Sequence, residues 1–231
     1  MIIDVQDLRV RRGAFELSVP SFSVSPGEVV GVVGPNGAGK TSLLECLAGL
    51  LKRDGGRVVV LGSDPMRDPV AVRSATGFVT PDQPVFDIRI GELIRLVSGY
   101  YGTWDATLAE SLRERFDLDP KQRTSKLSLG QGTRLRLLLA LAFRPKLLLL
   151  DEPASGLDLS ARHALMEMVL GFVEGGETAI LLSSHRLGDV ERLSERLLVL
   201  QGGRVVTQGR TDALLGEDRT LEEALVAWGA A

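Results

Sequence analysis

Short apolar runs bounded by turn residues alternate along the chain with amphipathic stretches. Such runs are typical of strands buried on both faces of a sheet. We expect a central strand over residues 28–33 and short buried strands over residues 147–150, 178–182 and 196–200. Further strand candidates are residues 57–61 and 77–79. Residues 2–10 and 16–19 are predicted to pair at an edge of the sheet, and the turn at Gly202-Gly203 predicts a hairpin between residues 196–200 and 204–207. The pattern therefore predicts an α/β fold with a largely buried sheet.

Between residues 82 and 144 the pattern changes to helical spacing, with almost no β-branched runs. The helices expected in this segment are residues 90–101, 106–116 and 129–143. Elsewhere, helices are expected over residues 40–47, 159–173, 186–193, 212–215 and 221–228. We therefore expect one domain over residues 1–231, with a core formed by residues 1–81 and 145–231 and a helical insertion over residues 82–144.

Composition and charge exclude several classes of protein. Of the 231 residues, 44% are hydrophobic and 25% are charged, which is typical of a globular protein and not of a disordered one. The net charge of −3 disfavours nonspecific binding to nucleic acid, so no nucleic-acid partner is expected. The single cysteine, Cys46, excludes an internal disulfide framework.

The longest apolar run, residues 137–143, is much shorter than the roughly 18 residues that a membrane span needs. The first residues show no basic segment followed by an apolar one, so no signal peptide is predicted. We expect a soluble, cytoplasmic chain that cannot form a channel by itself.

A glycine-rich segment between the predicted strand 28–33 and the predicted helix 40–47 matches the phosphate-loop pattern G-x-x-x-x-G-K-[ST]. Glycines let backbone N–H groups turn inward around an anion, and the helix N-terminus adds partial positive charge. Lys40 supplies a cation for the β- and γ-phosphates, and the Thr41 hydroxyl is the expected Mg²⁺ ligand. The alternative is a turn without a ligand. The predicted nucleotide-binding residues are Gly34, Pro35, Asn36, Gly37, Ala38, Gly39, Lys40, Thr41 and Ser42.

Two acidic residues, Asp151 and Glu152, follow the four leucines of the predicted strand 147–150. The carboxyl ends of strands are where open α/β sheets bind ligands. At that position Asp151 can hold Mg²⁺ through water, and Glu152 can orient or deprotonate a water molecule aimed at the γ-phosphate. An acidic turn after a core strand is the alternative. The phosphate loop earlier in the chain favours the functional interpretation.

Three further motifs occur in a fixed order with these two sites: Leu127-Ser128-Leu129-Gly130-Gln131, Ser155-Gly156-Leu157-Asp158 and Ser183-Ser184-His185. With this set the chain resembles the ATP-binding cassette (ABC) ATPases over essentially its whole length. The family signature is usually L-S-G-G-Q, and Leu129 replaces its third residue here. The resemblance implies the fold of a P-loop NTPase, with a RecA-like catalytic core, an antiparallel β edge subdomain and an inserted α-helical subdomain.

The resemblance also implies a head-to-tail dimer of cassettes that holds ATP and Mg²⁺ between the subunits. The phosphate loop of one cassette would face the signature of the other, so Ser128, Gly130 and Gln131 would contribute to the partner's ATP site. Ser128 is also expected as the N-cap of the helix that begins at Leu129, and both roles can hold at once.

The remaining two motifs resemble the D-loop and the switch segment of the family. Asp158 of the D-loop would belong to the nucleotide site. His185 would contact the γ-phosphate and help to position Glu152 and water. The alternative for His185 is a residue at the start of the predicted helix 186–193 that binds no ligand.

Two positions depart from the family pattern. Where the family has an aromatic residue that stacks on adenine, this chain has Arg12, whose flat guanidinium could also stack on the base, and Phe15 is the other candidate. The alternative for both residues is a position on an edge strand without contact to a ligand. The family also has a glutamine that ligates Mg²⁺ after a strand like residues 77–79. That position falls on Pro81, so Gln83 is the predicted ligand and Asp82 the weaker candidate.

The resemblance favours an ATPase that powers a membrane transporter, with the permease a separate polypeptide. The chain would then lie on the inner face of the cell membrane through its permease, beside a second, identical or different cassette. The segment around residues 83–91 would receive a permease helix, with Phe86, Ile88 and Ile90 as exposed apolar candidates; packing within the helical insertion is their alternative. Residues 100–105 are similar to export cassettes of the ABC-2 kind.

Two other functions remain open. The departures at Arg12, Gln83 and Leu129 are compatible with a regulatory cassette that binds nucleotide and hydrolyses it weakly. A soluble ABC ATPase without a transport role is the other alternative. Family members that organise DNA carry a long coiled coil between phosphate loop and signature, whereas here 88 residues separate Lys40 from Ser128.

Overall fold

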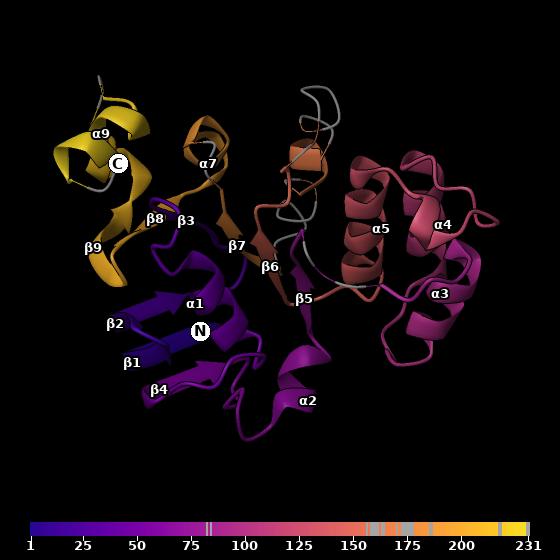
Figure 1. Cartoon of the computed structure of the whole chain (residues 1–231), viewed down its shortest axis with the longest axis horizontal. Helices are drawn as coiled ribbons and strands as arrows, with labels where there is room; N and C mark the ends of the chain where they lie inside the picture. The colour runs from indigo at the N-terminus through magenta and orange to yellow at the C-terminus, as the bar shows by residue number, and fades with distance from the viewer. Residues whose placement is uncertain are drawn as a thin grey trace.

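The computed structural model describes residues 1–81, 83, 85–155, 157, 162, 165–169, 171, 178–184, 187–216 and 219–229. Within these ranges, nine strands form one sheet in the order β4-β1-β2-β9-β8-β3-β7-β6-β5 (Figure 1). The strands are β1 (Ile3–Arg12), β2 (Phe15–Val24), β3 (Val29–Val33), β4 (Gly55–Val60), β5 (Thr76–Val79), β6 (Leu147–Asp151), β7 (Ala179–Ser183), β8 (Arg196–Gln201) and β9 (Arg204–Arg210). The predicted α/β class is confirmed.

The centre of the sheet is parallel and buried on both faces. β3 pairs with β7 and β8, β6 pairs with β5 and β7, and all four pairings are parallel. In β6, Leu147 and Leu149 belong to the hydrophobic cluster on one face, whereas Leu148 and Leu150 belong to the cluster on the other. This alternation explains why the sequence of β6 is continuously apolar.

The predicted pairing of residues 2–10 with 16–19 is confirmed as the antiparallel pair β1–β2, but its predicted place at the edge is wrong. β1 also pairs antiparallel with β4, so β4 is the strand at that edge. The reason lies in the register, which sets Val58 and Val60 of β4 opposite Val5 and Ile3. These four side chains are buried in the same cluster.

Most helices begin and end within three residues of the predicted positions. They are α1 (Lys40–Leu47), α3 (Ile90–Ser98), α4 (Ala106–Arg115), α5 (Leu129–Leu141), α7 (Leu187–Leu193), α8 (Thr211–Leu215) and α9 (Leu221–Ala227). The short helix α2 (Pro69–Arg73) was not predicted; Asp68 caps it by accepting the N–H of Ala71. Of the predicted helix 159–173, residues 162, 165–169 and 171 are helical, and the others lie outside the described residues.

Helices α3, α4 and α5 lie side by side at one end of the molecule, beyond β5 (Figure 1). α5 joins this group to the sheet, because it contacts both α4 and β5. Leu135 and Leu138 of α5 share one hydrophobic cluster with Leu148 and Leu150 of β6. The grouping agrees with a helical insertion over residues 82–144, while the exact division of the domain stays a prediction.

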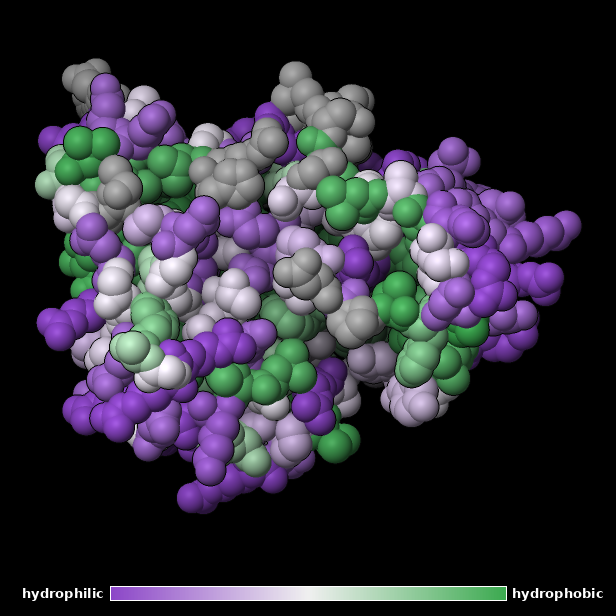
Figure 2. All heavy atoms as spheres, viewed as in Figure 1, coloured by the Kyte–Doolittle hydropathy of each residue, from purple (hydrophilic) through white to green (hydrophobic). Residues whose placement is uncertain are grey.

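Figure 2 shows mostly polar side chains at the outer end of this helical group, around α4, and apolar side chains nearer α5. Of the three apolar residues expected to be exposed near residues 83–91, only Phe86 is, with 70% of its surface accessible. Ile90 is fully buried because it begins α3 and packs in the helical cluster, and Ile88 is partly buried. Among the described helices, none is both long and apolar enough to cross a membrane.

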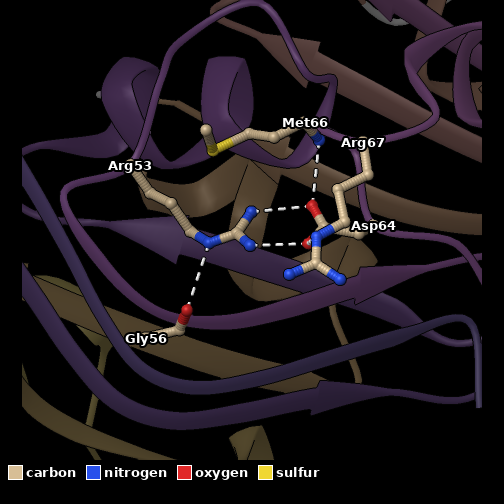
Figure 3. Close-up of polar contacts among 5 residues, drawn as sticks. All are labelled: Arg53, Gly56, Asp64, Met66 and Arg67. Carbon is tan, nitrogen blue, oxygen red and sulfur yellow. Dashed lines mark hydrogen bonds and ion pairs between the residues drawn. The ribbon is translucent and has the colours of Figure 1, made fainter.

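A bidentate ion pair fixes the loop that follows β4 (Figure 3). The two terminal guanidinium nitrogens of Arg53 donate to the two carboxylate oxygens of Asp64 at 2.8 and 2.6 Å. Arg53 Nε also donates to the carbonyl of Gly56, and the Met66 N–H donates to Asp64. The hydrogen bonds from Arg53, chiefly, and from Met66 lower the pKa of Asp64 to about 2.

Replacing Asp64 by Asn should therefore lower the free energy of unfolding at pH 7 by about 1–2 kcal/mol. The folded-state pKa lies below the ordinary 3.8, so the carboxylate contributes its full stability above about pH 4 and loses it as the pH falls through 2. Urea denaturation at pH 7 and pH 3 measures the effect. The difference between Asp64→Asn and the parent should shrink to roughly half at pH 3.

Glu110→Gln is the matched control, because Glu110 also forms an ion pair with an arginine, Arg113, but is exposed on α4. Solvent screens that pair, so little change is expected at either pH. A loss of stability in Asp64→Asn that is equal at pH 7 and pH 3 would contradict the assignment.

Candidate functional site

Three neighbouring strands end together at the candidate site. β7 lies between β3 and β6 and is parallel to both. Ser183, the last residue of β7, is in register with Val32 of β3 and with Asp151 of β6. The phosphate loop begins two residues after Val32, so the fold places it at the same sheet edge as Asp151 and Glu152.

The loop between β3 and α1 has a backbone that only glycine fits at two positions. Gly34 has a φ of +144°, and a Cβ atom there would lie 2.0 Å from the carbonyl oxygen of Leu200. Gly39 has a φ of +108°, and a Cβ atom there would lie 2.9 Å from the side chain of Leu17. No side chain caps the N-terminus of α1, so its first N–H groups remain available for an anion.

Lys40, the first residue of α1, is 7% exposed. Its Nζ donates to the carbonyl oxygens of Gly34 and Pro35 at 2.8 and 3.1 Å, which holds the ammonium group inside the loop. Burial lowers the pKa of Lys40, while the negative charges of Glu152 and Asp151 act in the opposite direction. The ammonium group of Lys40 is therefore held against the phosphate loop before any ligand binds.

The carboxylate of Asp151 is hydrogen-bonded through both of its oxygens. Thr41 Oγ1 donates to Oδ2 at 2.7 Å, and Ser183 Oγ donates to Oδ1 at 2.5 Å. The N–H of Glu152 lies 3.1 Å from both the hydroxyl and the carbonyl oxygen of Ser183. Glu152 has a φ of +47°, an unusual conformation for a residue with a side chain.

Lys40, Thr41, Asp151 and Glu152 line one open pocket of about 460 Å³, whereas Gly34, Pro35 and Ser183 lie outside its lining. Its lining residues are Arg12, Phe15, Asn36, Gly37, Ala38, Gly39, Lys40, Thr41, Ser42, Asp151 and Glu152. The structure therefore brings together most of the phosphate loop, both predicted acids and both candidates for contact with the base. Lys40 and the N-terminus of α1 bring positive charge to the pocket, and the two acidic residues bring negative charge.

The hydroxyl and carboxylate oxygens of Thr41 and Asp151 suit Mg²⁺, a hard cation that prefers oxygen ligands. Among the described residues, no group of three or more His, Cys, Asp or Glu side chains could hold a metal ion. Mg²⁺ commonly binds through one or two protein ligands together with phosphate and water. The donor set thus fits a magnesium ion that arrives with a phosphorylated ligand.

Arg12 and Phe15 lie on β1 and β2 on either side of the turn that joins these strands, and both reach the pocket. An Arg12 terminal nitrogen lies 3.1 Å from a carboxylate oxygen of Glu45, on α1, which holds the guanidinium beside the pocket. The Phe15 ring lies near Gly39. Both residues therefore stay candidates for stacking on a base. Glu45 belongs to no motif and was not predicted from the sequence.

Gln83 does not line this pocket. Its carbonyl oxygen accepts a hydrogen bond from Arg136 Nε at 3.1 Å, and its side chain lines a separate cavity of about 190 Å³ that also includes Tyr101. The side-chain oxygen of Gln83 is buried there without a hydrogen-bond partner. Its predicted role as a magnesium ligand stays a prediction, and it requires the side chain to move.

The signature segment also lies away from the pocket lining. Ser128 caps α5, as expected: its hydroxyl accepts the Gln131 N–H at 3.2 Å, and its own N–H donates to the Gln131 side chain at 3.0 Å. Ser128 and Leu129 are exposed at the start of this helix, and Gly130 follows them. A second cassette could therefore reach this end of α5. The predicted residues Asp158 and His185 lie outside the described part of the chain.

Comparison with known proteins supports the resemblance to the ABC ATPases. The family model described as "ABC transporter" matches residues 17–155. The Nod factor export ATP-binding protein I of Rhizobium etli is 37% identical over 209 residues, which is 87% of this chain and 65% of that protein. The daunorubicin resistance ATP-binding protein DrrA3 of Streptomyces coeruleorubidus is 37% identical over 201 residues, covering 84% of this chain and 63% of that protein.

Among solved structures, one described as the ATP binding subunit of an ABC transporter superposes with a TM-score of 0.90 at 28% identity. The superposition covers 99% of this chain and all of that one. This chain spans only about two thirds of the length of the relatives compared by sequence. The family model nevertheless covers more than half of the chain, from β2 through the carboxylates of the pocket. The chain therefore belongs to the ABC transporter family.

Proposed function

We propose that this chain binds and hydrolyses ATP, and that hydrolysis powers a membrane transporter whose permease is a separate polypeptide. The observation that carries the proposal is the 2.7 Å hydrogen bond between Thr41 and Asp151. It joins the phosphate loop to the acidic end of β6 across 110 residues of sequence. An anion site and a cation site are thereby held in one pocket, as a metal–nucleotide complex requires.

Binding uses the groups that already point into the loop. Backbone N–H groups and the α1 N-terminus would hold the phosphates, and Lys40 would turn from the carbonyls of Gly34 and Pro35 to the β- and γ-phosphates. Thr41 and Asp151 would hold Mg²⁺, which neutralises charge on the phosphates when bound. Arg12 or Phe15 would contact the base.

Hydrolysis would use Glu152, which ends the acidic pair and lines the pocket. Its carboxylate would accept a proton from water as the water oxygen bonds to the γ-phosphorus. The bond from that phosphorus to the bridging oxygen of ADP would break in the same reaction. Lys40 lies on the phosphate side of the pocket, where it would stabilise the negative charge that develops.

The site is proposed to be completed by a second, identical or different cassette. Ser128, Gly130 and Gln131 would reach the γ-phosphate of the partner's nucleotide, and Asp158 and His185 would contribute further contacts. In support, Ser128 and Leu129 are exposed at the N-terminus of α5, away from the pocket of their own chain. A helix N-terminus suits contact with a phosphate.

The permease would lie against the helical group near Phe86. This exposed aromatic residue precedes α3 and is an apolar contact available to a membrane subunit. Such a contact would place the chain on the cytoplasmic face of the membrane. Two relatives carry the names Nod factor export and daunorubicin resistance, which supports export over import.

Glu152→Gln should lower the rate of ATP hydrolysis by at least about 100-fold, because the amide cannot accept the proton from water. ATP binding should persist, since glutamine has nearly the same size and the phosphate loop is unchanged. Steady-state phosphate release and equilibrium binding of ATP measure the two effects. With ATP bound but not hydrolysed, this variant should also sediment as a dimer.

Glu222→Gln is the control for that experiment, because Glu222 is an exposed acid on α9, outside the pocket. It should hydrolyse ATP like the parent. If Glu152→Gln and the parent hydrolyse ATP equally slowly, the chain is a regulatory cassette and the proposed reaction is wrong.

Lys40→Ala should weaken ATP binding by roughly 10- to 100-fold, because charge-assisted hydrogen bonds to phosphate are lost. The fold should survive, since the variant no longer buries an ammonium group. Calorimetric titration with ATP measures the affinity, and Lys52→Ala removes an exposed lysine as the control. Equal affinity in Lys40→Ala and the parent would show that ATP binds elsewhere.

Phe86→Asp should reduce co-purification of a membrane subunit from detergent-solubilised source cells, because a carboxylate replaces the apolar contact. Val70→Asp is the matched control, since Val70 is also 70% exposed but lies on α2. Mass spectrometry of the recovered proteins identifies subunits with membrane spans. Recovery of the parent without any such subunit would favour a soluble ABC ATPase.

A further inference from the structure

The hydroxyl group of Ser183 lies between the two acidic residues of the pocket. Ser183 is fully buried at the end of β7, in register with Asp151 on one neighbouring strand and Val32 on the other. Its Oγ donates to Asp151 Oδ1 at 2.5 Å and accepts the N–H of Glu152 at 3.1 Å. One side chain that is outside the pocket lining thus contacts both acids.

The hydrogen-bonding capacity of a hydroxyl group fits this double contact. A serine hydroxyl has one proton to donate and two lone pairs that can accept. The proton goes to Asp151, which leaves lone pairs for the Glu152 N–H. Thr41 donates to the other carboxylate oxygen at 2.7 Å, so the Asp151 carboxylate is held from both sides and its rotation is restricted.

The same hydroxyl group also fixes the backbone of Glu152. The Glu152 N–H has two acceptors at 3.1 Å, the carbonyl and the hydroxyl oxygen of Ser183. This anchoring occurs where the chain turns out of β6 with a φ of +47°. The direction in which the Glu152 side chain leaves the strand therefore depends on a contact with β7.

We propose that Ser183 is a positioning residue of the ATPase reaction. Its hydroxyl sets the orientation of the Asp151 carboxylate toward the metal ion and the backbone position of Glu152 toward the attacking water. This inference rests on the proposed function, because it assigns Ser183 a role in that same site.

Burial alone does not account for the position of this hydroxyl. Thr178 directly precedes the other end of β7 and is also buried, and its hydroxyl donates to the carbonyl of Pro145 at 2.8 Å. Neither Thr178 nor Pro145 lines the pocket that holds the two acids. Thr178 therefore offers a matched control: a buried hydroxyl with one hydrogen bond, beside the same strand but without contact to either acid.

The experiment compares Ser183→Ala, Ser183→Thr and Thr178→Val in the full chain. Three quantities are measured: the turnover number, the melting temperature, and the affinity for Mn²⁺ in the presence of a non-hydrolysable ATP analogue, followed by electron paramagnetic resonance. The Mn²⁺ titration reports on the metal site without any turnover.

Ser183→Ala should lower the turnover number and weaken Mn²⁺ binding, each by roughly tenfold or more, as is typical when a residue that orients a metal ligand is lost. Ser183→Thr keeps the hydroxyl and should restore both quantities toward the parent values. Thr178→Val should lower the melting temperature while turnover and Mn²⁺ affinity stay near those of the parent. The positioning role is overturned if Ser183→Ala behaves like Thr178→Val in all three measurements.

Two further comparisons test the role of Ser183. If Ser183→Ala does not fold, Ser183→Cys replaces the hydroxyl by a weak donor of similar shape, and parent-like turnover and Mn²⁺ affinity in that variant overturn the proposal. The parent separates a failure of the proposed ATPase function from a failure of the role of Ser183, and Lys40→Ala shows the signal expected when ATP binding is weakened. A parent that neither binds nor hydrolyses ATP contradicts the proposed function, whereas an active parent with an equally active Ser183→Ala contradicts only the role of Ser183.

Discussion

The hydrogen bond between Thr41 and Asp151 is the contact on which the geometry of the pocket depends. The two residues belong to α1 and β6, and α1 packs against both β6 and β7. Their approach requires the register that sets Val32, Ser183 and Asp151 in one row across three parallel strands. Since side chains alternate between the faces of a strand, a slip of one residue would turn Asp151 away from the loop.

Opposite charges in this pocket stabilise each other before any ligand binds. Lys40 is buried at a cost that lowers its pKa, and the nearby Glu152 and Asp151 partly offset that cost. Its ammonium group meanwhile bonds to backbone carbonyls of the loop. In the proposed complex, a phosphate would replace those carbonyls as the partner of Lys40, and a metal ion would bind beside Asp151. The pocket offers groups of both charges to such a complex.

Local signals in the sequence predicted the parts of the fold that depend on neighbouring residues. The apolar run of β6, the phosphate loop and the start of α1 at Lys40 were all identified, because each has its own composition or spacing. The position of β4 at the sheet edge could not be predicted, because it depends on pairing with β1 over a long sequence separation. α2 was missed because its five residues are too few to show a helical period.

The same limit applies to the site. Sequence motifs named Lys40, Thr41, Asp151 and Glu152, and the structure brings all four to one pocket. Ser183, which contacts Asp151, belongs to the Ser183-Ser184-His185 motif, but that motif did not predict the contact. The ion pair between Arg12 and Glu45 depends on the three-dimensional fold, and so does the separate cavity that Gln83 lines. Which residues touch the acids is a property of strand register, and no spacing along the chain encodes it.

The backbone at Glu152 shows why the acidic turn favours function over stability. A φ of +47° suits glycine, whereas a residue with a Cβ atom pays roughly 1 kcal/mol or more for it. Glycine would relieve that strain but would remove the carboxylate from the pocket. The hydrogen bonds of the Glu152 N–H to Ser183 supply part of the compensation, because they hold the turn in the strained conformation. The cost falls on one residue. β6 stays paired with β7 up to Asp151, and Glu152, the next residue, lines the pocket.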